Sequence, residues 1–95
     1  MRFEWDESKA RANRRKHGID FRDAARVFED PAASHSIDDA IDYDEERAQA
    51  VGIVDGVTLV IIYVERVERI RLVSARKATK REEQDHFRER GSGID

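Results

Sequence analysis

The chain has 95 residues, and none of them is cysteine. Disulfide bonds, thiolate zinc sites and thiol nucleophiles are therefore excluded, and the absence favours a cytoplasmic protein. Long apolar runs are missing too, because the longest, VTLVIIYV at 57–64, is far too short to span a bilayer. The first residues, MRFEWDESK, contain no apolar stretch of the kind that export requires, so we expect no targeting segment and no membrane association.

An excess of positive charge is also absent. The chain has 18 Lys and Arg against 21 Asp and Glu, a net charge of −3, and this total alone argues against nucleic-acid binding. The distribution is uneven, however, since 9–16 (KARANRRK) contains cations and no anion, whereas 29–46 contains anions and no cation. A positive face can therefore coexist with the negative total. A second cationic set consists of Arg66, Arg69, Arg71, Arg76, Lys77, Lys80 and Arg81.

Length and composition indicate a single domain over residues 1–95. A hydrophobic content of 39% is enough for one modest core, and 41% charged residues imply a strongly ionic surface. The N-terminal third predicts a short extended segment, FEW, followed by a helix over 7–17 that Asp6 caps and Gly18 ends. This helix has few large apolar residues, so its packing face must consist of Ala10, Asn13 and His17.

A second helix is expected after Asp20, with its end near Pro31. Its apolar stripe follows the i, i+3, i+4, i+7 spacing and consists of Phe21, Ala24, Ala25 and Phe28.

From residue 33 onward the pattern changes to strands. SHSI (34–37) is a candidate edge strand, and the acidic residues 38–46 read as an exposed loop. The segments 47–54 and 57–64 are separated by Asp55-Gly56, a strong hairpin signal, and the second is apolar on both faces, as expected of a central strand.

The C-terminal third predicts one more strand and a helix. ERVE (65–68) turns the chain into RIRLVSAR (69–76), and Thr79 and Glu82 then form a capping box that opens a helix lasting until Gly91. The fold class is therefore α+β: a compact domain with a short N-terminal strand, two helices, an antiparallel sheet of three to four strands and a C-terminal helix.

Several segments together resemble the BrnT family of toxins from bacterial type II toxin–antitoxin systems. They are FEWD, KHGIDF, ERAQAVG, VIIYVER and IRLVSARKAT, and the resemblance covers residues 3 to 86. It implies a fold similar to that of the RelE ribonucleases and an activity on RNA that inhibits translation. It also implies a BrnA-type antitoxin partner, which contacts operator DNA through a ribbon-helix-helix domain, so that DNA is bound only through the antitoxin.

Metal-independent RNA cleavage uses the ribose 2′-hydroxyl as nucleophile. The enzyme must help to remove its proton, stabilise charge on the phosphate and help the 5′-oxygen to leave, which requires cations and a proton carrier close together. The chain has many Arg and Lys residues, three His and several Glu, which is the inventory needed for the endoribonuclease that the resemblance implies, without a metal or another cofactor.

Arg76 and Lys77 are the main candidates for phosphate contact, because they end a strand beside a helix N-terminus. The alternative is that Arg76 pairs with Glu82 while Lys77 is solvated. Arg66 could join the same site if the strand ends converge, or it is a simple turn residue. Arg69 and Arg71 are interpreted as solvated strand residues.

Two histidines are candidate proton carriers. His17 lies at the C-terminus of a helix whose dipole favours the imidazolium, although its ring could equally pack against Trp5 or Phe21. His86 stands where the resemblance implies a tyrosine, and its ring could transfer a proton or stack on a base.

The remaining candidates have plain structural alternatives. His35 is interpreted as exposed and Tyr63 as core, while Glu46 could orient an arginine, act as a base or form an ion pair. A group of cations is expected to contact the RNA backbone or an acidic partner, unless it is only a solvated surface: Arg14, Arg15, Lys16 and Lys80.

Two classes of function thus stay open. The first is an endoribonuclease toxin held inactive by its antitoxin. The second is a non-catalytic binding module, or a degenerate toxin, that acts with its antitoxin as an operator co-repressor.

Overall fold

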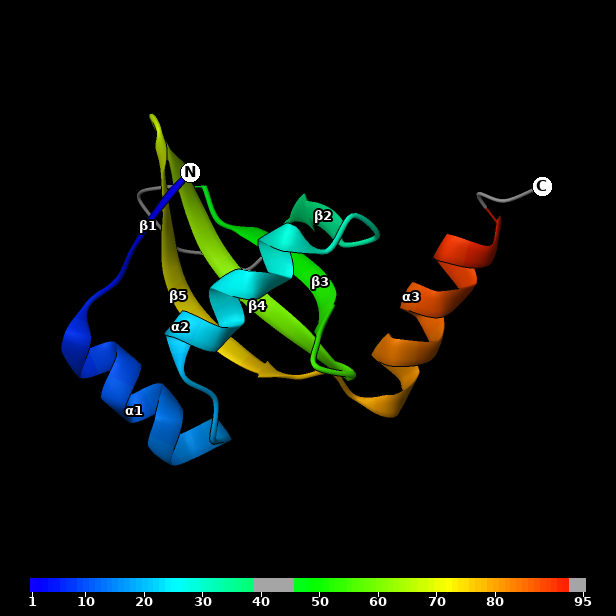
Figure 1. The fold of residues 1–95 in the computed structure, drawn as a ribbon, viewed down its shortest axis with the longest axis horizontal. Coiled ribbons are helices and arrows are strands. Elements are labelled where there is room, and N and C mark those ends of the chain that lie inside the picture. Colours follow the sequence, from blue (N-terminus) through cyan, green and yellow to red (C-terminus); the bar gives the residue numbers. More distant parts are fainter. Residues whose placement is uncertain (39–45, 93–95) are drawn as a thin grey trace.

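The computed structural model describes residues 1–38 and 46–92, which form one sheet with helices on both of its faces (Figure 1). The acidic loop predicted at 38–46 lies almost wholly outside the described residues. No helix in the described part of the chain is long and apolar enough to cross a membrane. The elements are β1 (Arg2–Glu4), α1 (Glu7–His17), α2 (Phe21–Ala24), the 3₁₀ helix η1 (Ala25–Glu29), β2 (Ser34–Ile37), β3 (Ala48–Val54), β4 (Val57–Arg66), β5 (Arg69–Lys77) and α3 (Lys80–Ser92).

The sheet has five strands in the order β1-β5-β4-β3-β2. Strands β2 to β5 are antiparallel, as the sequence predicts, and β4 is central. The predicted sheet of three to four antiparallel strands lacks one strand. The N-terminal strand β1 also belongs to the sheet, and because it pairs with β5 in parallel, the sheet is mixed. Phe3 of β1 lies opposite Ile70 and packs against the core, which fixes this short strand in register.

The predicted caps and turns are present. Asp6 accepts a hydrogen bond from the Lys9 amide at the start of α1, and Gly18 ends this helix with φ 72°. Asp55 and Gly56 connect β3 to β4 with φ values of 50° and 82°, as a tight primed hairpin turn requires.

The second helix departs from its prediction after one turn. Phe21, Ala24 and Val27 are all fully buried, and their spacing of three residues is that of a 3₁₀ helix, which η1 adopts. The α-helical stripe predicted from the sequence includes Ala25 and Phe28, which are only partly buried, and it omits Val27. The tighter helix brings Val27 directly onto the sheet.

Gly52 makes this approach possible. A Cβ atom at this position of β3 would lie 2.9 Å from Val27 Cγ1 and 3.1 Å from Ala33 Cβ. We expect Gly52→Ala to lower the free energy of unfolding by about 1–3 kcal/mol, because η1 must move away from the sheet. Urea unfolding followed by Trp5 fluorescence measures this, and a stability within about 0.5 kcal/mol of wild type would contradict it.

Asn13 attaches α1 to the sheet. This residue is 7% exposed, and its Nδ2 donates to the carbonyl oxygens of Ile19 (3.1 Å) and Ala75 (2.9 Å), while its Oδ1 accepts from the Ala75 amide (3.1 Å). Both backbone groups of Ala75 therefore point away from β4, at an edge of β5 that β1 does not reach. The carboxamide bonds this edge as a neighbouring strand would.

We expect Asn13→Ala to destabilise the fold by about 2–4 kcal/mol, because the substitution leaves three buried backbone groups without partners. Arg15→Ala, on the exposed side of the same helix, should change stability by less than about 0.5 kcal/mol. Both values come from urea unfolding curves. Equal effects of the two substitutions would show that the carboxamide bridge contributes nothing beyond helix propensity.

Candidate functional site

The junction of β5 and α3 holds Arg76 in an ion pair with Glu82. Arg76 Nη1 and Nη2 donate to Glu82 Oε1 and Oε2 at 2.7 and 2.9 Å. The predicted capping box is confirmed, since Glu82 Oε1 accepts from the Thr79 amide (2.8 Å) and Thr79 Oγ1 accepts from the Glu82 amide (3.1 Å). The alternative anticipated for Arg76, pairing with Glu82, is therefore the arrangement that the structure contains.

This pair keeps both groups charged. The Arg76 guanidinium, helped by the Thr79 amide, lowers the pKa of Glu82 from 4.5 to about 2, and the hydrogen bonds from Arg76 are the largest cause. The carboxylate in turn raises the pKa of Arg76. A phosphate at Arg76 would have to displace a fully ionised carboxylate with matching bidentate geometry. Lys77 and Lys80 lie exposed at the same junction.

His86 belongs to α3 and is buried, with only 3% of its surface exposed. Its Nδ1 lies 3.3 Å from Ser34 Oγ, and its Nε2 is buried with no hydrogen-bond partner among the residues the structure describes. The imidazole lines a cavity of about 400 Å³ between α3 and the strands β2 and β3, together with the carboxylates of Glu82, Asp85 and Glu89. The carboxylates that line this cavity disfavour the binding of a phosphate beside His86. The buried imidazole therefore serves to pack α3 against the sheet.

The cations of α1 form a separate surface. Arg14 pairs with Asp20 at 3.0 Å, and Arg15 and Lys16 are exposed. His17 is half-buried and lines a shallow cavity of about 230 Å³ together with Lys16. Figure 1 shows α1 and α3 at opposite sides of the view, and Arg76 pairs with Glu82 of α3, so the structure does not bring the predicted RNA-contacting cations of α1 into the β5–α3 junction.

Arg66 also lies far from Arg76. In the β4–β5 register Arg66 is opposite Arg69, whereas Arg76 is opposite Val60. Seven residues of strand separate Arg69 from Arg76, which corresponds to about 23 Å. The strand ends therefore do not converge, and the two arginines do not form one site.

Arg66 instead lines a cavity of about 540 Å³ at the other end of the sheet. The cavity contains an imidazole–phenol pair, His35 Nδ1 and Tyr63 Oη, 3.0 Å apart. Glu46 and Glu65 contribute carboxylates to the same walls. One concave site thus combines a proton carrier, a phenol, carboxylates and a guanidinium.

An aromatic residue of the core, Phe28, packs against both members of this pair. The ring of Phe28 lies 5.6 Å from that of His35 and 5.0 Å from that of Tyr63. Burial, and secondarily the charge of Glu65, raises the pKa of Tyr63, so its phenol stays protonated at neutral pH. In the tautomer that carries the ring proton on Nδ1, His35 can donate to the Tyr63 hydroxyl, and its Nε2 is then free to accept a proton.

The structure confirms that His35 is an exposed strand residue, but sequence reasoning missed its pairing with Tyr63. The pairing depends on the register that places His35 opposite Ala50, and Ala50 next to Ile61, on the face of Tyr63. No local motif encodes such a relation. Within residues 1–38 and 46–92, no three His, Asp or Glu side chains are arranged to hold a metal ion.

Comparison with known families identifies the class of protein. Residues 5–82 match the family model described as ribonuclease toxin, BrnT, of type II toxin–antitoxin system. The chain therefore belongs to the BrnT family of ribonuclease toxins, which confirms the resemblance seen in the sequence. No curated protein sequence matches the chain. Toxins of type II systems are paired with an antitoxin, so family membership implies such a partner.

The Arg76–Glu82 pair makes stability depend on pH. Because the pKa of Glu82 is lowered to about 2 in the folded protein, its stabilising effect is complete above its ordinary value of 4.5 and is lost as the pH falls toward 2. We expect wild type to be more stable than Glu82→Gln near neutral pH, and this difference to shrink over that window. Urea unfolding followed by far-UV circular dichroism measures it. A difference that stays constant with pH would contradict this role of the pair.

Proposed function

We propose that this protein is an endoribonuclease toxin that cleaves RNA through the 2′-hydroxyl without a metal ion and thereby inhibits translation. Its family membership supports the ribonuclease class. We further propose a BrnA-type antitoxin with a ribbon-helix-helix domain as its partner, through which alone the complex contacts operator DNA. The active site that we assign is the cavity lined by His35, Glu46, Tyr63 and Arg66.

The observation that carries this assignment is the combination of groups in one cavity. Arg66, with 44% of its side chain exposed, is accessible to a phosphate, in contrast to the buried His86. Nε2 of His35 is the acceptor that we assign to the 2′-hydroxyl proton, because Nδ1 lies within hydrogen-bond distance of Tyr63 Oη. Glu46 lines the same cavity and can hold the imidazolium once it forms.

The reaction is a transesterification within one RNA strand. The 2′-oxygen forms a bond to phosphorus as its proton passes to His35, and Arg66 stabilises the added charge on the phosphate oxygens. The bond from phosphorus to the 5′-oxygen breaks, and Tyr63 gives its proton to that oxygen while it receives one from His35 through their hydrogen bond. The products are a 2′,3′-cyclic phosphate and a 5′-hydroxyl, and every proton is accounted for.

A non-catalytic role is supported by one observation. The group that sequence reasoning places at the centre of catalysis, Arg76, is occupied by Glu82. A protein that acted only as a binding module or co-repressor would have no need of a free guanidinium there. In that case Arg76, Lys77 and His86 would influence affinity or folding alone.

Cleavage of purified RNA separates these possibilities. Refolded protein is incubated with RNA and a chelator, and fragment ends are tested for 2′,3′-cyclic phosphate. We expect wild type to cleave, and His35→Ala or Arg66→Gln to be slower by about 10²-fold or more, because each loses a group that acts in the transition state. Arg26→Gln is the matched control, since Arg26 pairs with Asp55 on the exposed β3–β4 hairpin.

The opposite pattern of activities would reject the cavity of His35 and Tyr63 as the active site. Loss of cleavage in Arg76→Ala with full activity in His35→Ala would place catalysis at the β5–α3 junction. Intact RNA in every reaction, including wild type, would reject cleavage of free RNA and favour the binding role.

A further inference from the structure

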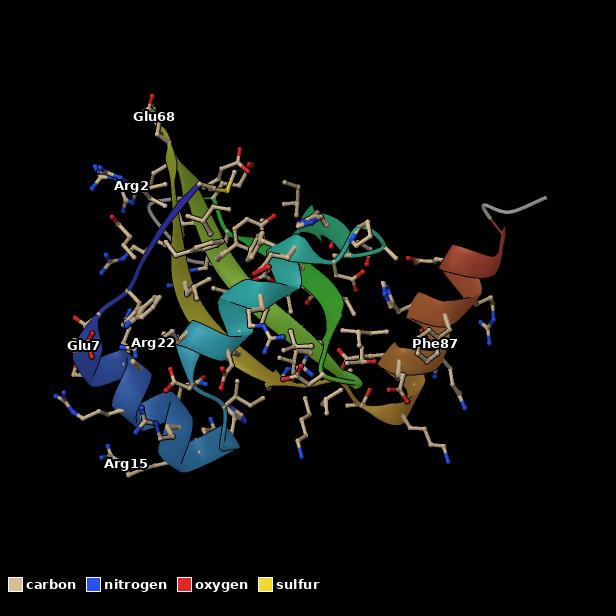
Figure 2. All side chains as sticks on the ribbon, viewed as in Figure 1. Arg2, Glu7, Arg15, Arg22, Glu68 and Phe87 are labelled. Atoms are coloured by element: carbon tan, nitrogen blue, oxygen red, sulfur yellow. The ribbon has the colours of Figure 1, made fainter. Side chains whose placement is uncertain are left out.

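Three arginines form a row across three neighbouring strands. Arg2 of β1 lies opposite Arg69 of β5, and Arg69 lies opposite Arg66 of β4. Because partners in register point to the same face of a sheet, the three side chains project from the face opposite α1 and α2. Figure 2 shows Arg2 at the same end of the molecule as Glu68, which lies in the β4–β5 turn.

This arrangement is costly to the isolated sheet. Like charges directly opposite one another on neighbouring strands are destabilising. One carboxylate offsets part of the cost: Glu4 lies 3.2 Å from Arg69 Nη1 and 3.3 Å from Arg71 Nη1, and 3.9 Å from Arg66 Nε. Three guanidinium groups therefore lie within 4 Å of the same carboxylate.

The row remains accessible to a ligand. The side chains of Arg66, Arg69 and Arg71 are 44%, 54% and 35% exposed. The Arg2 side chain is exposed and forms no hydrogen bond or ion pair with the part of the chain that the structure describes. In contrast, Arg76 at the other end of β5 has a carboxylate of its own. The two ends of one strand thus differ in their capacity for an added anion.

We propose that the arginine row, defined as Arg2, Arg66, Arg69 and Arg71, binds the phosphate backbone of single-stranded RNA and leads it into the cavity of His35 and Tyr63. This inference deepens the proposed function and rests on it for the direction of the strand. Guanidinium groups bind phosphate oxygens in bidentate fashion, and several in line match a repeating anion. The row and Tyr63 lie on opposite faces of the sheet, and Arg66, which belongs to the row and also lines the cavity, is the residue that joins the two surfaces.

Binding of a non-cleavable RNA tests the row independently of catalysis. A fluorescein-labelled oligonucleotide, 2′-O-methylated at every position, is titrated with wild type, Arg2→Gln/Arg69→Gln and Glu4→Gln, and anisotropy is measured at several salt concentrations. Arg15→Gln is the matched control, because Arg15 is an exposed arginine of α1 on the rival cationic surface. Circular dichroism verifies that each variant is folded.

The variants should shift affinity in opposite directions. We expect the double variant to bind at least about tenfold more weakly and to lose about 0.7 from the slope of log affinity against log salt for each phosphate contact removed. Glu4→Gln should bind several-fold more tightly, because it removes the carboxylate that competes with phosphate. Arg15→Gln should stay within about twofold of wild type.

Several outcomes would overturn the inference. An unchanged salt slope in the double variant, or an equal loss in Arg15→Gln, would assign RNA binding to another surface. Equally tight, row-dependent binding of a poly-glutamate peptide would indicate an acidic protein partner in place of RNA. If the row binds this RNA while no RNA is cleaved in the experiment above, the proposed function fails and the inference stands. If RNA is cleaved but binding ignores the row, the inference alone fails.

Discussion

The fold depends on the hydrogen bonds of one buried side chain, Asn13. Helix α1 has few large apolar residues, so burial alone cannot hold it on the sheet, and its carboxamide bonds the backbone of Ala75 instead. The third bond, to Ile19, fixes the loop that starts α2. Because this attachment is polar and compact, the remaining faces of α1 can be strongly cationic without weakening the core. The same bonds close the edge of β5 where β1 stops.

Strand β5 therefore organises the molecule. Asn13 bonds its backbone at Ala75, its first three residues pair with β1, and both of its ends carry cations. At one end Arg76 meets a carboxylate in a one-to-one, bidentate pair. At the other, Arg66, Arg69 and Arg71 share Glu4. The proposal that the arginine row binds a polyanion rests on this difference in local stoichiometry, and the net charge of −3 contains no information about it.

Signals between residues close in sequence predicted much of the fold. Contacts between residues far apart in sequence could not be predicted from them. The caps at Asp6 and Asp20, the Asp55-Gly56 turn and the Thr79–Glu82 box each involve residues close in sequence, so their chemistry is visible in the letters. The parallel pairing of β1, which makes Arg2 a neighbour of Arg69, joins residues far apart in sequence. The His35–Tyr63 pair likewise requires two strand registers. Sequence analysis consequently found the cations but not the pairing of His35 with Tyr63.

The cost of the arginine row bears on why such a feature persists. A row of like charges lowers the stability of the sheet, and the pairing of Phe3 with the core is what keeps Arg2 opposite Arg69 against this repulsion. Structures retain unfavourable local arrangements chiefly where a ligand relieves them. A polyanion that binds only the folded row stabilises the protein by mass action. If RNA binds the arginine row as proposed, its phosphates reduce the repulsion between the arginines, and RNA binding then stabilises the pairing of β1 with β5.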